Sequence, residues 1–289
     1  MTSTNPPSTP VSRSKTAALA RTIDLVTKGY HFYCTGQCPA RRLPALLRKF
    51  HERYNIGCSP AQRLTRKQKG LANAALVVFL PQWDASEDGA DANNSGDASD
   101  SCLASQEETA QASDPAPRKA SVQRHAGSVE DAVRDMPADV QVEWLLLVTK
   151  GTGAAHEQEQ LCDVTDKQRL VFCRYELVRH SARGKAAWTW RRTRAEMGDL
   201  FALLEEQLKR RHVSSVALTL ARIARQPGFA GVREQSWRLC QFARQHGYDG
   251  ELPYLYFVQK VAHGERCLLQ DRRGRLTQGA EARFFGLAG

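Results

Sequence analysis

Short apolar runs separated by turn-forming residues are the clearest pattern in this chain, and they predict β-strands. The runs cover residues 30–35, 74–80, 142–149, 169–178 and 186–192. Between the first two runs, apolar side chains recur every three or four residues, which predicts an amphipathic helix over residues 40–56. Its stripe consists of Leu43, Leu46, Leu47, Phe50 and Tyr54. Several strands with one intervening helix favour an α+β fold with a mostly antiparallel sheet.

A very basic stretch, residues 59–70, follows this helix. It begins with Ser59 and Pro60, which suit the N-cap and the first position of a helix. We interpret the stretch as either a short basic helix or an ordered loop.

The pattern becomes helical after residue 192. Thr193 and Glu196 have the spacing of a capping box, and apolar residues follow them at helical spacing. Two more helices and a hairpin are predicted, over residues 213–225, 232–246 and 254–261 with 267–270. A pair of helices followed by a hairpin resembles a winged helix-turn-helix, so we expect this C-terminal part to have winged-helix character.

Four parts of the chain follow from these elements. Residues 1–28 are expected to be a disordered N-terminal arm, because the chain begins rich in Ser, Thr and Pro. Residues 29–83 and 140–192 are expected to form the sheet domain. Residues 84–139 are polar and too long for an ordinary loop, so we predict a disordered insertion. Residues 193–289 form the helical region.

Charge is divided unevenly between these parts. The 289 residues carry 41 Lys and Arg against 31 Asp and Glu, a net charge of +10. Residues 84–117 hold nine of the acids and no Lys or Arg, so the remainder carries +19, from 41 bases and 22 acids. A body this basic attracts polyanions, and nucleic acid is the first candidate.

Three groups of residues are candidates for contact with nucleic acid. The first two are expected to bind phosphates, because bases there far outnumber acids; a solvated surface is the alternative. The third lies on the predicted helix 232–246 and would read base edges, as Arg and Gln can. The groups are Arg41, Arg42, Lys49, Arg63, Arg66, Lys67 and Lys69; Arg191, Arg192 and Arg194; and Arg233, Gln235, Arg238 and Gln241.

Two tryptophans lie within the second basic group. Trp188 and Trp190 share one face of their predicted strand. If exposed beside arginines, they would form a stacking platform for single-stranded nucleic acid. The alternative is that both fill the core between sheet and helix, as aromatic pairs usually do.

Signals for catalysis and metal binding are weak. Cys34 and Cys38 have a ligand-like spacing and Cys58 could join them, but no second close pair completes a tetrahedral set. We therefore expect no metal and no cofactor, and we assign no catalytic residue. His31, Tyr33 and His180 remain acid–base candidates.

No apolar run approaches the roughly 18 residues of a membrane span, so we expect no membrane partner. The N-terminus also lacks the apolar region of a secretory signal. A cytoplasmic location is therefore expected.

Five short segments lie within or beside the predicted elements: residues 71–74, 144–149, 175–179, 188–191 and 227–233. Together they resemble uncharacterised accessory proteins of proteobacterial plasmids and integrative conjugative elements. None of them is a catalytic motif. The resemblance implies a mobile-element context and raises the expectation of a role in DNA replication, transfer or regulation.

We therefore expect a non-enzymatic protein that binds nucleic acid, DNA more than RNA, as an accessory or regulatory protein of a mobile element. The acidic segment could compete with nucleic acid for the basic body, in which case deleting residues 84–117 should tighten binding at low salt. Two other classes stay open. One is a metal-independent RNA-processing nuclease on a ferredoxin-like sheet, and the other is a protein-interaction adaptor with partners in a mobile-element complex.

Overall fold

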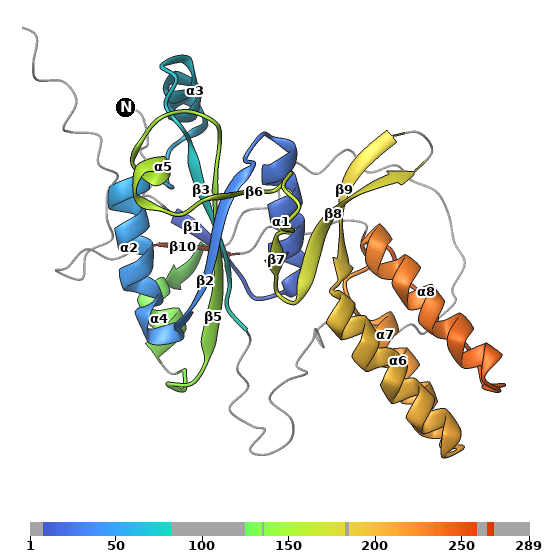
Figure 1. The fold of residues 1–289 in the computed structure, drawn as a ribbon. Coiled ribbons are helices and arrows are strands. Elements are labelled where there is room, and N and C mark those ends of the chain that lie inside the picture. Colours follow the sequence, from blue (N-terminus) through green and yellow to red (C-terminus); the bar gives the residue numbers. More distant parts are fainter. Residues whose placement is uncertain (1–7, 82–124, 135, 183–184, 259–264, 269–289) are drawn as a thin grey trace, which may run out of the picture.

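The computed structural model describes residues 8–81, 125–134, 136–182, 185–258 and 265–268. The acidic segment 84–117 lies outside the described residues. The described part consists of two β-sheets, several helices packed around the larger sheet, and a group of C-terminal helices (Figure 1).

The larger sheet has seven strands in the order β4-β10-β1-β3-β5-β2-β6. Its centre is antiparallel: β5 pairs with β2 on one side and with β3 on the other. The β1–β3 and β10–β4 pairings are parallel. The strands are β1 (Ser8–Ser12), β2 (Phe32–Pro39), β3 (Ala74–Phe79), β4 (His125–Ser128), β5 (Gln141–Val148), β6 (Cys162–Asp163) and β10 (Glu265–Leu268).

One face of this sheet is covered by η1 (Ala40–Arg42), α2 (Leu43–Tyr54), α4 (Val129–Arg134) and α5 (Ala154–Gln158) (Figure 1). Leu47 and Phe50 of α2 are buried in one cluster with Leu146 of β5. They come from the predicted apolar stripe, so α2 forms where its sequence has one apolar side to bury.

The opposite face is covered by α1 (Lys15–Thr27) and by a three-stranded antiparallel sheet, β7 (Val171–Phe172), β8 (Tyr175–Ala182) and β9 (Lys185–Arg192). Every residue of β3 is buried because helices or strands cover both faces. This explains why β3 is a continuous apolar run rather than an alternating one.

The C-terminal helices form a separate small core. Leu204 of α6 (Arg194–Lys209), Leu220 of α7 (Val213–Ala224) and Leu239 of α8 (Ala230–Gln245) are fully buried together. Figure 1 shows this group extending away from the larger sheet beyond β8 and β9.

The α+β class is confirmed: helices and strands are mixed, and most strand pairings are antiparallel. Two helix starts also form as predicted. The Ser59 side chain accepts a hydrogen bond from the backbone of Gln62 in a complete capping box. Thr193 accepts one from the backbone of Glu196.

The predicted disorder of residues 1–28 and 84–139 is wrong at two places. Residues 8–27 form β1 and α1, and Leu19 and Val26 are fully buried beneath the second sheet. Residues 125–134 form β4 and α4, with Val129 and Val133 buried against α2. In residues 15–27 the apolar side chains recur at helical spacing and pack between the two sheets, a pattern that the Ser-, Thr- and Pro-rich start of the chain obscured. Residues 125–134 have few apolar side chains, and α2 covers those of Val129 and Val133.

The predicted wing is also wrong. Residues 251–258 form no strand, and β10 pairs with β1 and β4 at the edge of the larger sheet. A strand can pair with any open edge, and the sequence of β10 does not specify which one. The C-terminal helices therefore carry no hairpin formed by these residues.

Candidate nucleic-acid interface

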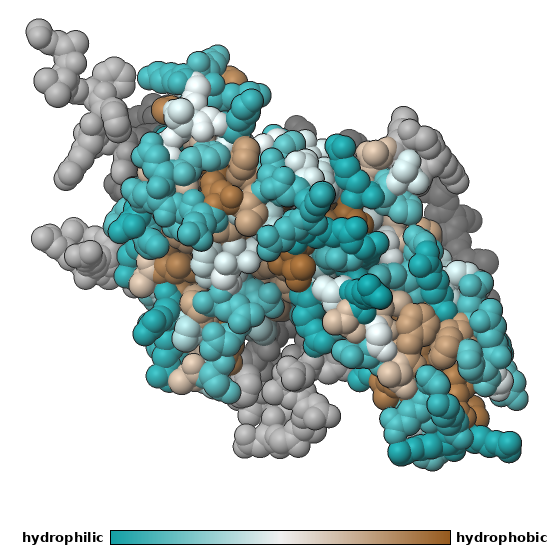
Figure 2. Space-filling model, viewed as in Figure 1, coloured by the Kyte–Doolittle hydropathy of each residue, from teal (hydrophilic) through white to brown (hydrophobic). Residues whose placement is uncertain are grey.

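Helix α3 (Pro60–Gln68) lies at one end of the molecule and carries Arg63, Arg66 and Lys67 of the first basic group, with Lys69 directly after it (Figure 1). None of its residues is buried. The surface around it is mainly hydrophilic in Figure 2. With no apolar side to bury, this helix must be held in place by polar contacts.

Two arginines of α3 supply those contacts. The guanidinium group of Arg63 donates to the carbonyl oxygens of Ile56 at 2.8 Å and Ala74 at 3.1 Å, and to the Tyr30 hydroxyl. Arg66 donates to the carbonyl oxygen of Ala72 at 2.7 Å. Their guanidinium groups hold α3 against the start of β3, so the geometry does not support phosphate contact by these two side chains.

Lys67 and Lys69 differ from these two arginines. Both are exposed, and neither has an ion pair within the described part of the chain. Backbone hydrogen bonds join Ala72 to Thr152 and Thr152 to Gly70, which brings the loop after β5 beside them. Lys150 lies two residues before Thr152 in this loop. It is also exposed and has no ion pair among the described residues.

Lys150 thus becomes a third member of this surface, and sequence analysis missed it. The close approach depends on Gly151, whose φ is +142°. A Cβ there would lie 2.7 Å from the backbone nitrogen of Ala72. Lys67, Lys69 and Lys150 are called the lysine end below. In the sequence, the only signal for the position of Lys150 is the glycine that directly follows it, Gly151.

Arg41, Arg42 and Lys49 do not join the lysine end. Pro39, two residues before Arg41, pairs with the first residue of β5, whereas Ala74, six residues after α3, pairs with its last. The two arginines therefore lie at the opposite end of the sheet, about 24 Å away at 3.4 Å per strand residue. Both arginines are exposed. Lys49 lies between the ends, with its Nζ 3.8 Å from a carboxylate oxygen of Glu159.

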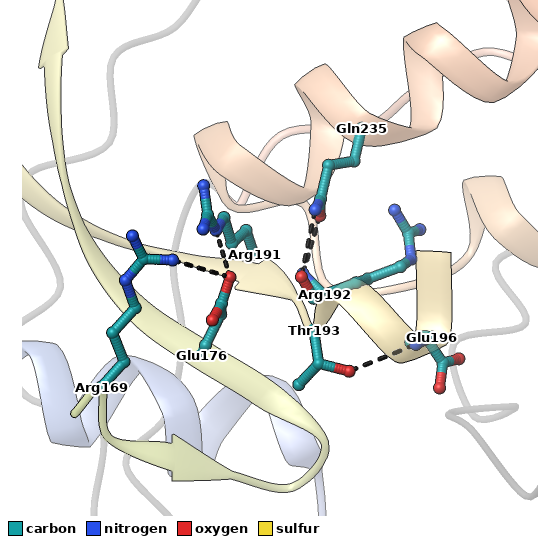
Figure 3. A network of polar contacts seen from close by, with 7 residues as sticks. All are labelled: Arg169, Glu176, Arg191, Arg192, Thr193, Glu196 and Gln235. Atoms are coloured by element: carbon teal, nitrogen blue, oxygen red, sulfur yellow. Dashed lines mark hydrogen bonds and ion pairs between the residues drawn. The ribbon is translucent and has the colours of Figure 1, made fainter. Parts of the chain in front are cut away.

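The second basic group is largely neutralised or buried (Figure 3). Arg191 pairs with Glu176, which lies directly opposite it on β8, and Arg169 reaches the same carboxylate at 3.3 Å. Arg194 is exposed at the start of α6. Arg194 is therefore the exposed member of this group that has no carboxylate partner among the described residues.

Phosphate contact by Arg192 is wrong, because this side chain is only 1% exposed. Its Nε donates to Gln226 at 2.7 Å, one Nη to the carbonyl oxygen of Val232 at 3.1 Å, and the other to Ser236 at 2.9 Å. Burial lowers the pKa of the guanidinium below its ordinary value. Arg192 therefore ties the end of β9 to the start of α8.

Gln235 completes this junction. Its side chain accepts from the backbone nitrogen of Arg192 at 2.7 Å and donates to the backbone oxygen of the same residue at 3.1 Å (Figure 3). The amide therefore extends the hydrogen bonding of β9 onto α8. The geometry does not support base reading by Gln235.

The other three predicted base readers differ in their surroundings. Arg233 donates to the carbonyl oxygen of Leu255, and its guanidinium carbon lies 3.2 Å from the ring centroid of Phe257. Arg238 is exposed and pairs with Glu234 one turn earlier. Gln241 is exposed. These side chains cover one exposed side of α8.

Of the two tryptophans within the second basic group, one fills the core, which was the alternative to a stacking platform. Trp190 is fully buried, and its indole nitrogen donates to the carbonyl oxygen of Leu19 at 2.9 Å. Trp188 is half-buried, with the Arg179 guanidinium 5.1 Å from its ring. The pair therefore does not form an open stacking platform.

The acid–base candidates are dispersed. Tyr33 is buried in the core beneath the second sheet, and burial, with a smaller effect of Cys162, raises its pKa to about 12. His31 immediately precedes β2, whereas His180 lies on β8 of the other sheet. The fold does not bring the three side chains into one site.

Cys34 and Cys38 lie on one side of β2 and pack against the core under α2. Burial, and then the nearby Glu159, raise the pKa of Cys34 to about 12, so its thiol is protonated at neutral pH. Among the described residues, no three His, Cys, Asp or Glu side chains are grouped to hold a metal ion. No helix in the described ranges is long and apolar enough to cross a membrane.

Comparison of the chain with protein-family models, curated proteins and solved structures found no match. The functional argument therefore depends on the geometry alone.

Proposed function

We propose that this protein binds nucleic acid, DNA in preference to RNA, through exposed cations, chiefly those of the lysine end. The observation that supports this is the unpaired state of Lys67, Lys69 and Lys150 on a projecting helix and loop. The proposal keeps the expected role of a cytoplasmic accessory protein of a mobile genetic element.

The physical argument is that the positive charges of the lysine end repel one another and have no acidic partner within the described ranges to offset this repulsion. Several exposed bases elsewhere on the surface have acids one helical turn away, as in the pairs Lys28–Asp24, Lys209–Glu205 and Arg210–Glu206. The lysine end has no such partner among the described residues. A phosphate backbone would lower the repulsion between these cations and release its own counterions.

The test is a salt titration of binding to duplex DNA, with a triple charge reversal at the lysine end. K67E/K69E/K150E should weaken binding to any sequence. If all three lysines contact phosphates, the slope of log K against log salt should fall by about 3, at roughly 0.9 per lost contact. Arg63 and Arg66 must stay unchanged, because they hold α3 in place.

K28E/K209E/R210E is the matched control. It makes the same change of net charge at exposed positions whose bases already have carboxylate partners. Its salt slope should stay near that of the wild-type protein. Equal slopes for the wild type and the lysine-end variant would refute the proposed interface, as would an equal loss in both variants.

A further inference from the structure

One side of α8 carries a cation, an aromatic ring and an amide on consecutive turns. Arg233, Trp237 and Gln241 are four residues apart, so they lie on the same side of the helix. The core-facing residues Leu239 and Ala243 lie on another side. Trp237 is 50% exposed, which is unusual for so large an apolar ring.

The segment 251–258 brings more rings beside Arg233, in the first turn of this helix. It is held by hydrogen bonds from Arg233 to the carbonyl oxygen of Leu255 and from the backbone nitrogen of Val258 to Gly228. Three of its side chains are more than half exposed: Tyr254, Tyr256 and Phe257. Together with Arg233 and Trp237 they are called the aromatic stripe.

The stripe has ring faces available to a ligand. Tyr254 and Tyr256 meet edge to face, with centroids 4.9 Å apart, so they do not cover one another's faces. The Arg233 guanidinium lies over Phe257 and positions that ring. A group of exposed aromatic side chains is a candidate interaction site.

Charge indicates which partner the stripe suits. Residues 213–258, which span α7, α8 and the segment with the exposed rings, contain five arginines and three acids, Glu234, Asp249 and Glu251. Glu234 is already paired with Arg238. Exposed rings beside Arg233, on a part of the chain with a net positive charge, favour a ligand that offers both flat apolar faces and negative charge.

We propose that the aromatic stripe binds the unpaired bases of single-stranded nucleic acid by stacking. This inference deepens the proposed function by naming the substrate class. Bases stack on exposed aromatic and guanidinium faces whatever their sequence, and nearby arginines attract the phosphates. In a duplex the base faces are covered by neighbouring pairs, so the stripe discriminates between the two forms while the lysine end does not.

The experiment measures anisotropy of labelled single-stranded DNA, single-stranded RNA and duplex DNA of matched length. W237A and Y254A/Y256A should each weaken binding to single strands by about fivefold or more, the lower limit for one lost base stack. Binding to duplex DNA should change by less than about twofold, because no stack is lost there. Circular dichroism and thermal melting verify that the variants remain folded.

Two further variants separate stacking from general damage. L218A removes an apolar side chain that is 72% exposed on α7, and it should leave single-strand binding unchanged. W237F keeps a ring at the same position and should restore most of the affinity that W237A loses. Failure of W237F to restore binding would overturn a stacking role for this position.

The outcomes distinguish this inference from the proposed function. Wild-type binding that depends on the lysine end but not on the stripe would overturn the stripe and leave the proposed function standing. An equal loss on single strands and duplex would also overturn it. No binding by the wild-type protein to any of the three ligands would refute both.

Discussion

Arg192 shows how the role expected for a residue from the sequence can differ from its role in the structure. In the sequence it is one base in a basic run, next to Arg191 and two positions before Arg194. In the structure its guanidinium group satisfies polar groups of α7, α8 and the loop between them inside the protein. A buried guanidinium is tolerated only with such partners.

We therefore predict that R192M strongly destabilises the protein. The substitution removes the donors and leaves buried acceptors unsatisfied, at about 1–3 kcal/mol each, so a loss of about 3 kcal/mol or more is expected in urea denaturation. R194A is the control, since Arg194 is exposed, and it should change the free energy of unfolding by less than about 0.5 kcal/mol. Similar values for the two variants would contradict the assigned role of Arg192.

His51 leads to a prediction about pH. Burial lowers its pKa from the ordinary 6.5 to about 4 in the folded protein. Between these values the unfolded chain binds more protons than the folded one, so stability falls as pH is lowered through this window. The loss attributable to His51 is at most about 3 kcal/mol.

The check compares denaturant unfolding of wild type and H51Q from pH 7 down to pH 4. The wild-type protein should lose stability more steeply, and the difference between the two should shrink toward low pH. Parallel curves across this window would show that His51 does not titrate as described.

At the scale of elements, glycine determines how closely segments approach. The segment 251–258 lies against the loop between α7 and α8, and a Cβ on Gly228 would overlap the carbonyl group of Tyr256. G228A should therefore displace this segment without changing any of its aromatic side chains. We expect it to lower single-strand affinity as Y254A/Y256A does, measured in the same anisotropy assay.

G198A is the matched control for this change. Gly198 lies within α6, and a Cβ there would meet nothing within 4 Å. Alanine should stabilise the helix by about 1 kcal/mol and leave binding unchanged. If G228A binds single strands as well as G198A does, the position of the segment is irrelevant to the ligand.

Across the whole molecule, the exposed cations lie in separate places rather than in one patch. Arg41 and Arg42 are at one end of the larger sheet and the lysine end is at the other. The aromatic stripe lies on the C-terminal helices, beyond the second sheet. A ligand that contacted more than one of these surfaces would have to be long and negatively charged, which agrees with nucleic acid.

The sequence by itself determined the local elements, because their causes are local. Apolar runs specified β3 and β5, the stripe of apolar residues specified α2, and Ser59 and Thr193 began their helices. Net charge is likewise a sum over residues and needs no fold. For these features, each residue and its neighbours in the chain contain the whole signal.

Only the tertiary structure decided which charged and aromatic side chains are available to a partner. Arg192 became buried, Arg63 was turned inward, and Lys150 was brought beside residues 80 positions earlier in the chain. The tertiary fold also placed Trp190 in the core and left Trp237 exposed, although both lie among arginines in the sequence. Exposure depends on what packs against a side chain, and contacts between distant segments are not encoded in local pattern.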